Sequence, residues 1–170
     1  MMREPLPVSA EIVTPCANLG YYHWLLDSMG QVLIARRKMG DKVKVLVSRH
    51  ASRFLREGLR FFGITDTDLV QVDGPVLVDK AVMVARNNDL GVIFKDNIDI
   101  LRMEIEKRCV KTVLPFRKIY ISRRLERNRA IRNEESVENA VRNAGFEVCY
   151  FERMPFAEQI KTVSEARVIM

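Results

Sequence analysis

The sequence predicts an α/β protein with mainly parallel sheets. Short β-branched segments alternate with amphipathic segments of helical spacing along the chain, and this alternation is typical of parallel strands connected by helices. No internal repeat or low-complexity stretch interrupts it. Hydrophobic residues make up 48% of the 170 residues, which is enough to bury a substantial core.

Residues 1–115 predict one domain of this kind. The β-branched run of residues 42–48 predicts a strand, and Pro115 ends the last helix. The elements expected here are helices over 23–38, 51–62 and 97–113 and strands over 42–48, 69–72 and 76–84. The apolar stripe expected on the last of these helices comprises Ile98, Leu101, Ile105, Cys109 and Val113.

The alternation restarts in residues 116–170, which predict the first part of a second domain. Asn133 is placed to cap the first helix of this part. The expected elements are strands over 118–122, 146–151 and 167–170 and helices over 134–144 and 155–166. The inward residues of the first helix are expected to be Val137, Ala140, Val141 and Ala144. Because the chain ends on an apolar strand, we expect further sequence, a partner chain or self-association to complete the sheet.

Charge and composition favour some classes of partner and site and argue against others. The net charge of +6 and the pI of about 9.4 favour anionic partners. Because the sequence has no run of 18 apolar residues and no signal-peptide core, we expect no membrane span and a cytoplasmic protein. Cys16, Cys109 and Cys149 are odd in number and widely spaced, so neither a disulfide framework nor a metal site is expected.

A basic loop is the first candidate for a binding site. Residues 117–132 contain seven Lys or Arg residues and one acid, Glu126. Ligands of open α/β sheets bind at the carboxyl ends of strands, helix N-termini attract phosphate, and arginine pairs with phosphate oxygens. A nucleotide diphosphate is therefore expected at Ser122, Arg123, Arg124, Arg127 and Arg129. A solvated basic surface is the competing interpretation.

The second candidate is an aromatic cluster at the start of a helix. Tyr22, His23 and Trp24 are consecutive, and Asp27 lies one turn after His23. Histidine can act as a general base near neutral pH, while Asp27 can orient the ring or act as the base itself. A core aromatic cluster with a satisfied histidine is the alternative. His50 is interpreted as a surface residue.

These segments resemble glycosyltransferase family 61, which includes plant xylan-decorating enzymes, the extracellular O-GlcNAc transferase and many bacterial capsular polysaccharide proteins. The family's His-Trp-hydrophobic-hydrophobic-Asp motif is matched by His23–Asp27, although Gly20 stands where the family has Asn. Its later Ser-Arg and Arg-x-hydrophobic-x-Asn-Glu pattern is matched by Ile119–Arg123 and Arg129–Glu134. The resemblance spans residues 18–170 and is completed by Gly145–Glu147, Glu158–Ile160 and Ala166.

The resemblance implies two Rossmann-like domains in a GT-B-like arrangement, with an acceptor-side first domain (1–115) and a nucleotide-sugar-binding second domain (116–170). The family pattern continues with a His-Gly-Ala segment, so the second domain is expected to be C-terminally truncated. The implied reaction is an inverting, metal-independent transfer, without a cofactor, from a UDP-sugar to a glycan acceptor in bacterial polysaccharide biosynthesis. The implied catalytic residues are His23 and Asp27, and the implied substrate-binding residues are Tyr22, Trp24, Ser122, Arg123, Arg124, Arg129, Asn133 and Glu134.

Two other function classes stay open from the sequence. One is a non-catalytic α/β module that binds a nucleotide or is completed by a partner chain. The other is a nucleic-acid-binding domain, which typically places aromatic residues among basic ones so that bases can stack. Residues 117–132 offer only Tyr120, which lies within a predicted strand, so nucleic acid is not an expected partner.

Overall fold

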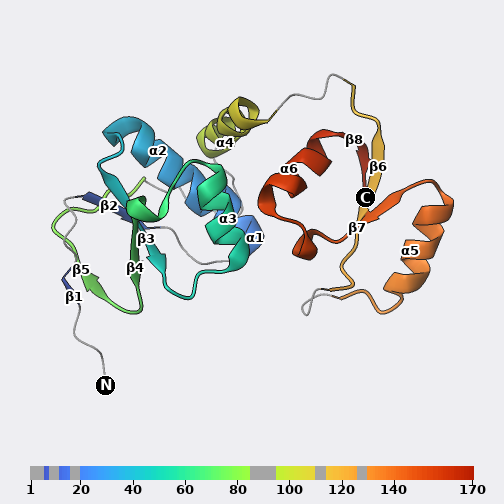
Figure 1. Ribbon diagram of the computed structural model, residues 1–170, viewed down its shortest axis with the longest axis horizontal. Coiled ribbons are helices and arrows are strands. Elements are labelled where there is room, and N and C mark those ends of the chain that lie inside the picture. Colours follow the sequence, from blue (N-terminus) through green and yellow to red (C-terminus); the bar gives the residue numbers. More distant parts are fainter. Residues whose placement is uncertain (1–5, 8–11, 16–19, 85–94, 110–113, 126–129) are drawn as a thin grey trace. The chain divides into compact units, whose positions relative to one another are not determined.

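The computed structural model describes residues 6–7, 12–15, 20–84, 95–109, 114–125 and 130–170 (Figure 1). They form two compact units, Met1–Lys107 and Arg108–Met170. Each unit contains a sheet whose strands all run parallel, together with its own helices. The predicted α/β class with parallel sheets is therefore confirmed.

The sheet of the N-terminal unit has three strands, in the order β2 (Ile12–Pro15), β3 (Val43–Ser48) and β4 (Leu69–Val72). A separate parallel pair joins β1 (Leu6–Pro7) and β5 (Val76–Leu77). Val43, Val45 and Val47 of the central strand are buried and alternate with half-buried residues, as successive side chains of a strand point to opposite faces. The valine-rich run therefore supplies the core of this unit.

A long helical segment follows β2 and packs on helix α3 (Arg53–Phe61). The segment consists of α1 (Tyr21–His23), a π-helical turn η1 (Trp24–Met29) and α2 (Gly30–Met39). The fully buried Trp24 indole lies so close to Gly58 of α3 that a Cβ added there would come within 2.1 Å of the Trp24 ring. Glycine at position 58 thus permits the close approach that buries the only tryptophan.

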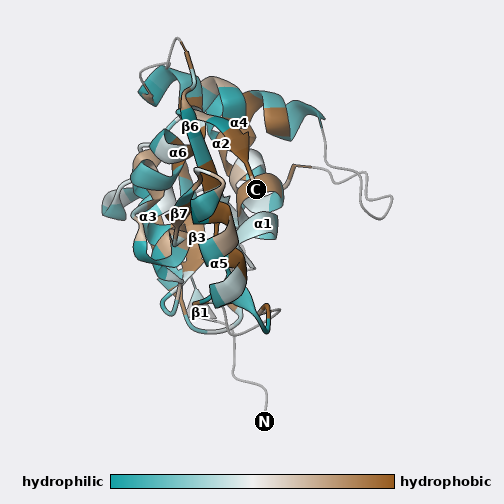
Figure 2. Cartoon of the chain, turned by 90° about the vertical axis from the view of Figure 1, so that its right-hand side faces the viewer, coloured by the Kyte–Doolittle hydropathy of each residue, from teal (hydrophilic) through white to brown (hydrophobic). Residues whose placement is uncertain are grey.

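Three features of this unit differ from the sequence interpretation. The strand expected over 76–84 is limited to Val76–Leu77, and the sequence interpretation missed β2. Helix α4 (Lys95–Arg108) buries Asn97, Ile100 and Leu101, whereas Ile98 of the expected stripe is 36% exposed. Val113 lies outside the described residues. Figure 2 shows hydrophilic and hydrophobic residues alternating along α4. Because the polar Asn97 is buried, the buried face of α4 is rotated relative to the expected apolar stripe.

The sheet of the C-terminal unit places β6 (Arg117–Ile121) between β7 (Glu147–Cys149) and β8 (Ala166–Ile169). The helices of this unit are α5 (Glu134–Asn143), a short 3₁₀ turn η3 (Phe151–Arg153) and α6 (Phe156–Ser164). Ile119, Tyr120 and Phe156 are buried in its core. The alternation of strand and helix is as predicted.

The buried face of α5 differs from the expected one. Glu134, Glu138 and Val141 are buried, while Ala140 and Ala144 are exposed. Apolar spacing alone would turn the alanines inward. The helix instead turns two acids toward the end of β6, where hydrogen-bond donors converge on them.

Candidate functional site

The His23–Asp27 pair lies where the helix becomes a π-turn. His23 Nδ1 is 2.9 Å from Asp27 Oδ2, as the four-residue spacing predicted. The His23 side chain is 62% exposed and that of Asp27 is 34% exposed. With the Nδ1 proton donated to the carboxylate, the neutral ring keeps its lone pair on Nε2. The pair is therefore accessible and oriented, and π-turns are frequent at functional sites.

The two aromatic residues beside His23 lie in different surroundings. Tyr22 is 54% exposed, and its ring meets the His23 ring edge-on at 5.2 Å between centroids. Trp24 is fully buried, with its ring centroid 5.4 Å from that of Phe54. Trp24 thus has the core role that the alternative interpretation gave it, and its contact with a substrate stays a prediction.

Asn97 of α4 anchors the π-turn. Its buried side chain donates from Nδ2 to the backbone carbonyl of Leu26 at 3.1 Å. Gly30 lies against it, and a Cβ added to Gly30 would come within 2.8 Å of the Asn97 side chain. Because a π-turn replaces i→i+4 hydrogen bonds with i→i+5 bonds, this side-chain donor supports an irregular stretch of backbone. The sequence interpretation missed Asn97, since a single buried amide produces no spacing signal.

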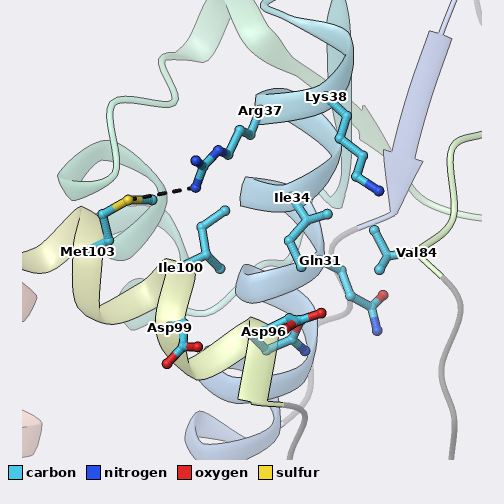
Figure 3. Close-up of a pocket in the computed structure, with 10 residues that line it drawn as sticks. Gln31, Ile34, Arg37, Lys38, Val84, Asp96, Asp99, Ile100 and Met103 are labelled. Atoms are coloured by element: carbon cyan, nitrogen blue, oxygen red, sulfur yellow. Dashed lines mark hydrogen bonds between the residues drawn. The ribbon is translucent and has the colours of Figure 1, made fainter.

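A cavity of about 570 Å³ lies between α2 and α4, beside Asn97 (Figure 3). Two cations on α2 and two acids on α4 line it, namely Arg37, Lys38, Asp96 and Asp99. Arg37 is turned toward the sulfur of Met103, at 3.7 Å. Because the charges of both signs offset one another, this cavity does not favour a diphosphate.

Glu134 holds the loop that follows β6 in the C-terminal unit. Its side chain is buried, with the residue only 4% exposed. Its Oε1 accepts hydrogen bonds from the Tyr120 hydroxyl at 2.9 Å, the Ser122 hydroxyl at 2.9 Å and the Arg123 backbone N–H at 2.8 Å. One carboxylate at the start of α5 therefore fixes the last residues of β6 and the first residues of the loop.

Glu138, one turn further along α5, is fully buried. Its Oε1 accepts from the Ser122 hydroxyl at 2.7 Å. Its Oε2 accepts from the Tyr150 hydroxyl at 3.0 Å and from the guanidinium groups of Arg142 and Arg124 at 3.1 and 3.3 Å. Since the Ser122 hydroxyl has one proton, it donates to one carboxylate at a time. The two glutamates thus share this donor.

The network keeps both carboxylates ionised. Burial acts to raise the pKa of Glu134, but hydrogen bonds from Arg123, Ser122 and Tyr120 outweigh it and lower the pKa below its usual range. Burial likewise opposes ionisation of Glu138, and donors that include Arg142 lower its pKa. Within the described part of the chain, Glu134 Oε2 has no hydrogen-bond partner. The anionic pair therefore depends on the donors around it.

The arginines of the predicted phosphate site lie in this loop. Arg123 is exposed. The half-exposed Arg124 pairs with Glu138 and, at 3.5 Å, with Glu135. The charge of Glu135, followed by that of Glu138, raises the pKa of Arg124. Arg129, together with Arg127, lies outside the described residues, so their place at the site stays a prediction.

Two further predicted residues have positions that the structure defines. Ser122 is 1% exposed, and its hydroxyl is held between the two glutamates. Asn133 precedes α5 at the predicted capping position, but its side chain is exposed and makes no capping hydrogen bond. Direct contact of either side chain with a substrate stays a prediction.

Glu138 is the main residue of this hydrogen-bond network that the sequence interpretation missed. The spacing of Glu134, Glu138 and Val141 by four and three residues places them on one helical face. A basic loop just before an acid pair at this spacing was the available signal. It was overlooked because acids are seldom expected on a buried face.

Within the described ranges, His, Cys, Asp and Glu side chains form no group of three or more that could hold a metal ion. Among the helices that the structure describes, none is both long enough and apolar enough to cross a bilayer.

The profile of the family Glycosyltransferase 61 matches residues 21–170, which include both the helix start at Tyr21 and the loop after β6. The chain belongs to glycosyltransferase family 61. No curated protein and no solved structure matches the chain significantly. As a member of family 61, the protein is a glycosyltransferase whose substrates are a sugar donor and an acceptor. The resemblance inferred from the motifs is thus confirmed.

Replacing Asn97 tests its support of the π-turn in this family 61 enzyme. Asn97→Leu keeps the approximate size of the side chain but leaves the part-buried Leu26 carbonyl without this donor, so we expect destabilisation by roughly 1–3 kcal/mol. Urea unfolding followed by the fluorescence of Trp24, the only tryptophan, measures this change. Asn143→Leu, at an exposed site on α5, is the control. Equal losses in the two variants would contradict the anchoring role.

The carboxylate pair predicts a pH-dependent stability. Because the folded pKa of Glu134 and of Glu138 lies below the ordinary value of about 4.3, their stabilisation is complete above that value and is lost as pH falls through the folded pKa. Glu138→Gln should destabilise the C-terminal unit by roughly 3 kcal/mol at pH 7, and the difference from the wild type should shrink toward pH 3.

Circular dichroism during urea unfolding, measured across this pH range, checks the expectation. Glu135→Gln is the matched control, because Glu135 lies on the same helix with its side chain 73% exposed; it should change stability by less than about 0.5 kcal/mol. A Glu138→Gln loss that is independent of pH would argue against an ionised pair.

Proposed function

We propose that this glycosyltransferase moves a sugar from a nucleotide-sugar donor, of the UDP class, to a glycan acceptor with inversion and without a metal ion. The proposed setting is bacterial polysaccharide biosynthesis. The proposed architecture is GT-B-like, with Rossmann-like units, the N-terminal unit taking the acceptor and the C-terminal unit the donor.

The observation that carries the proposal is the arginine-bearing loop fixed at the end of β6. Glu134 binds the backbone N–H of Arg123, and both glutamates bind the hydroxyl of Ser122. The loop lies at the carboxyl end of the central parallel strand and before the N-terminus of α5, where a diphosphate is favoured. We assign Ser122 and Glu134 to positioning this loop, and the guanidinium groups of Arg123 and Arg124 to the diphosphate.

The proposed chemistry is a single displacement. His23, oriented through Nδ1 by Asp27, accepts the proton of the acceptor hydroxyl on Nε2. The acceptor oxygen bonds to the anomeric carbon as the bond from that carbon to the diphosphate oxygen breaks, which inverts the configuration. The arginines stabilise the negative charge that develops on the departing nucleoside diphosphate, the role that a metal ion has in other enzymes.

Loss of one loop arginine should weaken donor binding. A nucleoside diphosphate at 100 times its dissociation constant stabilises a protein by roughly 2.7 kcal/mol, so we expect UDP to raise the melting temperature saturably. Arg123→Ala should remove most of this shift. Arg60→Ala, an exposed arginine of the N-terminal unit, changes the net charge equally and should keep it. Equal effects of the two variants would refute a specific diphosphate site.

Loss of the base should affect the reaction and spare donor binding. His23→Ala should lower the transfer rate by roughly 10²–10⁴-fold, and Asp27→Asn should lower it less if His23 is the base. Release of nucleoside diphosphate in the presence of mixed glycan acceptors measures the rate, and the melting shift with UDP measures binding. Unchanged transfer in His23→Ala would remove His23 from the mechanism.

A further inference from the structure

A second cavity in the N-terminal unit lies at the carboxyl ends of all three strands of its sheet. It measures about 390 Å³. Pro15, Ser48 and Val72, the last residues of β2, β3 and β4, line it, and so do His50 and Asp73, which follow β3 and β4. This edge of a parallel sheet is where ligands of open α/β folds bind. None of these residues takes part in the sites described above.

The loop after β3 is held rigidly beside this cavity. The backbone N–H of His50 donates to the Ser48 hydroxyl at 3.1 Å, and that of Arg49 donates to the Val72 carbonyl at 3.1 Å. From helix α3, Arg56 donates to the carbonyls of Arg49 at 2.6 Å and Ala51 at 3.1 Å. Backbone contacts at both ends of the loop lower the backbone entropy that is lost on binding. The backbone of this loop is therefore preorganised.

Three polar side chains converge here in a loose arrangement. Arg49 Nε is 3.4 Å from Asp73 Oδ2, and His50 Nε2 is 3.8 Å from Asp73 Oδ1. Both separations exceed the usual hydrogen-bond length, so a ligand hydroxyl can approach the carboxylate. Pro15 and Val72 add apolar surface. Arg49 offsets the charge of Asp73, so the cluster favours a neutral ligand with hydroxyl groups.

We propose that this cavity binds a neutral sugar unit of the glycan acceptor, with Asp73 accepting hydrogen bonds from its hydroxyls and His50 contacting the same unit. The helix that carries His23 starts after β2, so the cavity and the proposed base follow strands of one sheet edge. The inference rests on the proposed function in one respect, namely that the sugar bound here is the acceptor. The position and chemistry of the cavity are independent of the donor site.

Imidazole signals in NMR spectra of the whole chain test the proposal. The chain has two histidines, and His50→Gln identifies the signals of His50. The probes are neutral methyl glycosides of glucose, galactose, mannose and N-acetylglucosamine. At least one should shift the His50 signals saturably, and Asp73→Asn should weaken that binding roughly tenfold. Asp41→Asn, a highly exposed aspartate, is the control and should leave the affinity unchanged.

Each outcome separates this site from the donor site, because the melting shift with UDP is measured on the same samples. If no glycoside moves the His50 signals, or if Asp73→Asn binds as tightly as the control, the sugar site is overturned whatever UDP does. Tighter binding of methyl glucuronide, an anion, would overturn the neutral class. A glycoside effect without any UDP shift would support this site and contradict the proposed donor site.

Discussion

The burial of two ionised glutamates beside one strand end is the constraint on which the C-terminal unit depends. Charges are costly to bury unless donors surround them, and here the donors come from β6, the loop after it, α5 and the segment after β7. Satisfying Glu134 and Glu138 therefore fixes these elements against one another. The same contacts fix the backbone from which Arg123 and Arg124 project. The hydrogen bonds that compensate the buried charges therefore also shape the candidate anion site.

In the N-terminal unit, a buried uncharged amide has the corresponding role. Asn97 is buried and donates to a carbonyl in the π-turn, while Trp24 packs into the space that Gly58 leaves. Together they hold an irregular helix start that exposes Tyr22 and His23. In both units, a buried polar side chain supports exposed residues whose chemistry suits sugar transfer. This pattern is consistent with membership of family 61, because a glycosyltransferase must hold a donor and an acceptor.

Local sequence patterns correctly predicted those features that depend on interactions between residues close in sequence. Strands β3 and β4 and the His23–Asp27 contact depend on residues close in sequence, and the structure confirms them. The family could also be inferred, since its motifs are short and ordered. Apolar spacing mispredicted the buried faces of α4 and α5, because Asn97 and Glu138 are buried against polar groups of other elements. Apolar spacing assumes that polar residues face water, and here that assumption fails at the residues that shape the site.

The most direct test of this account is a crystal structure of the chain with bound UDP. The account predicts that the diphosphate lies against the guanidinium groups of Arg123 and Arg124, at the carboxyl end of β6, while Glu134 and Glu138 keep their contacts with Ser122. A diphosphate bound elsewhere, such as in the cavity between α2 and α4, would contradict it. So would a loop that leaves the two glutamates when the nucleotide binds.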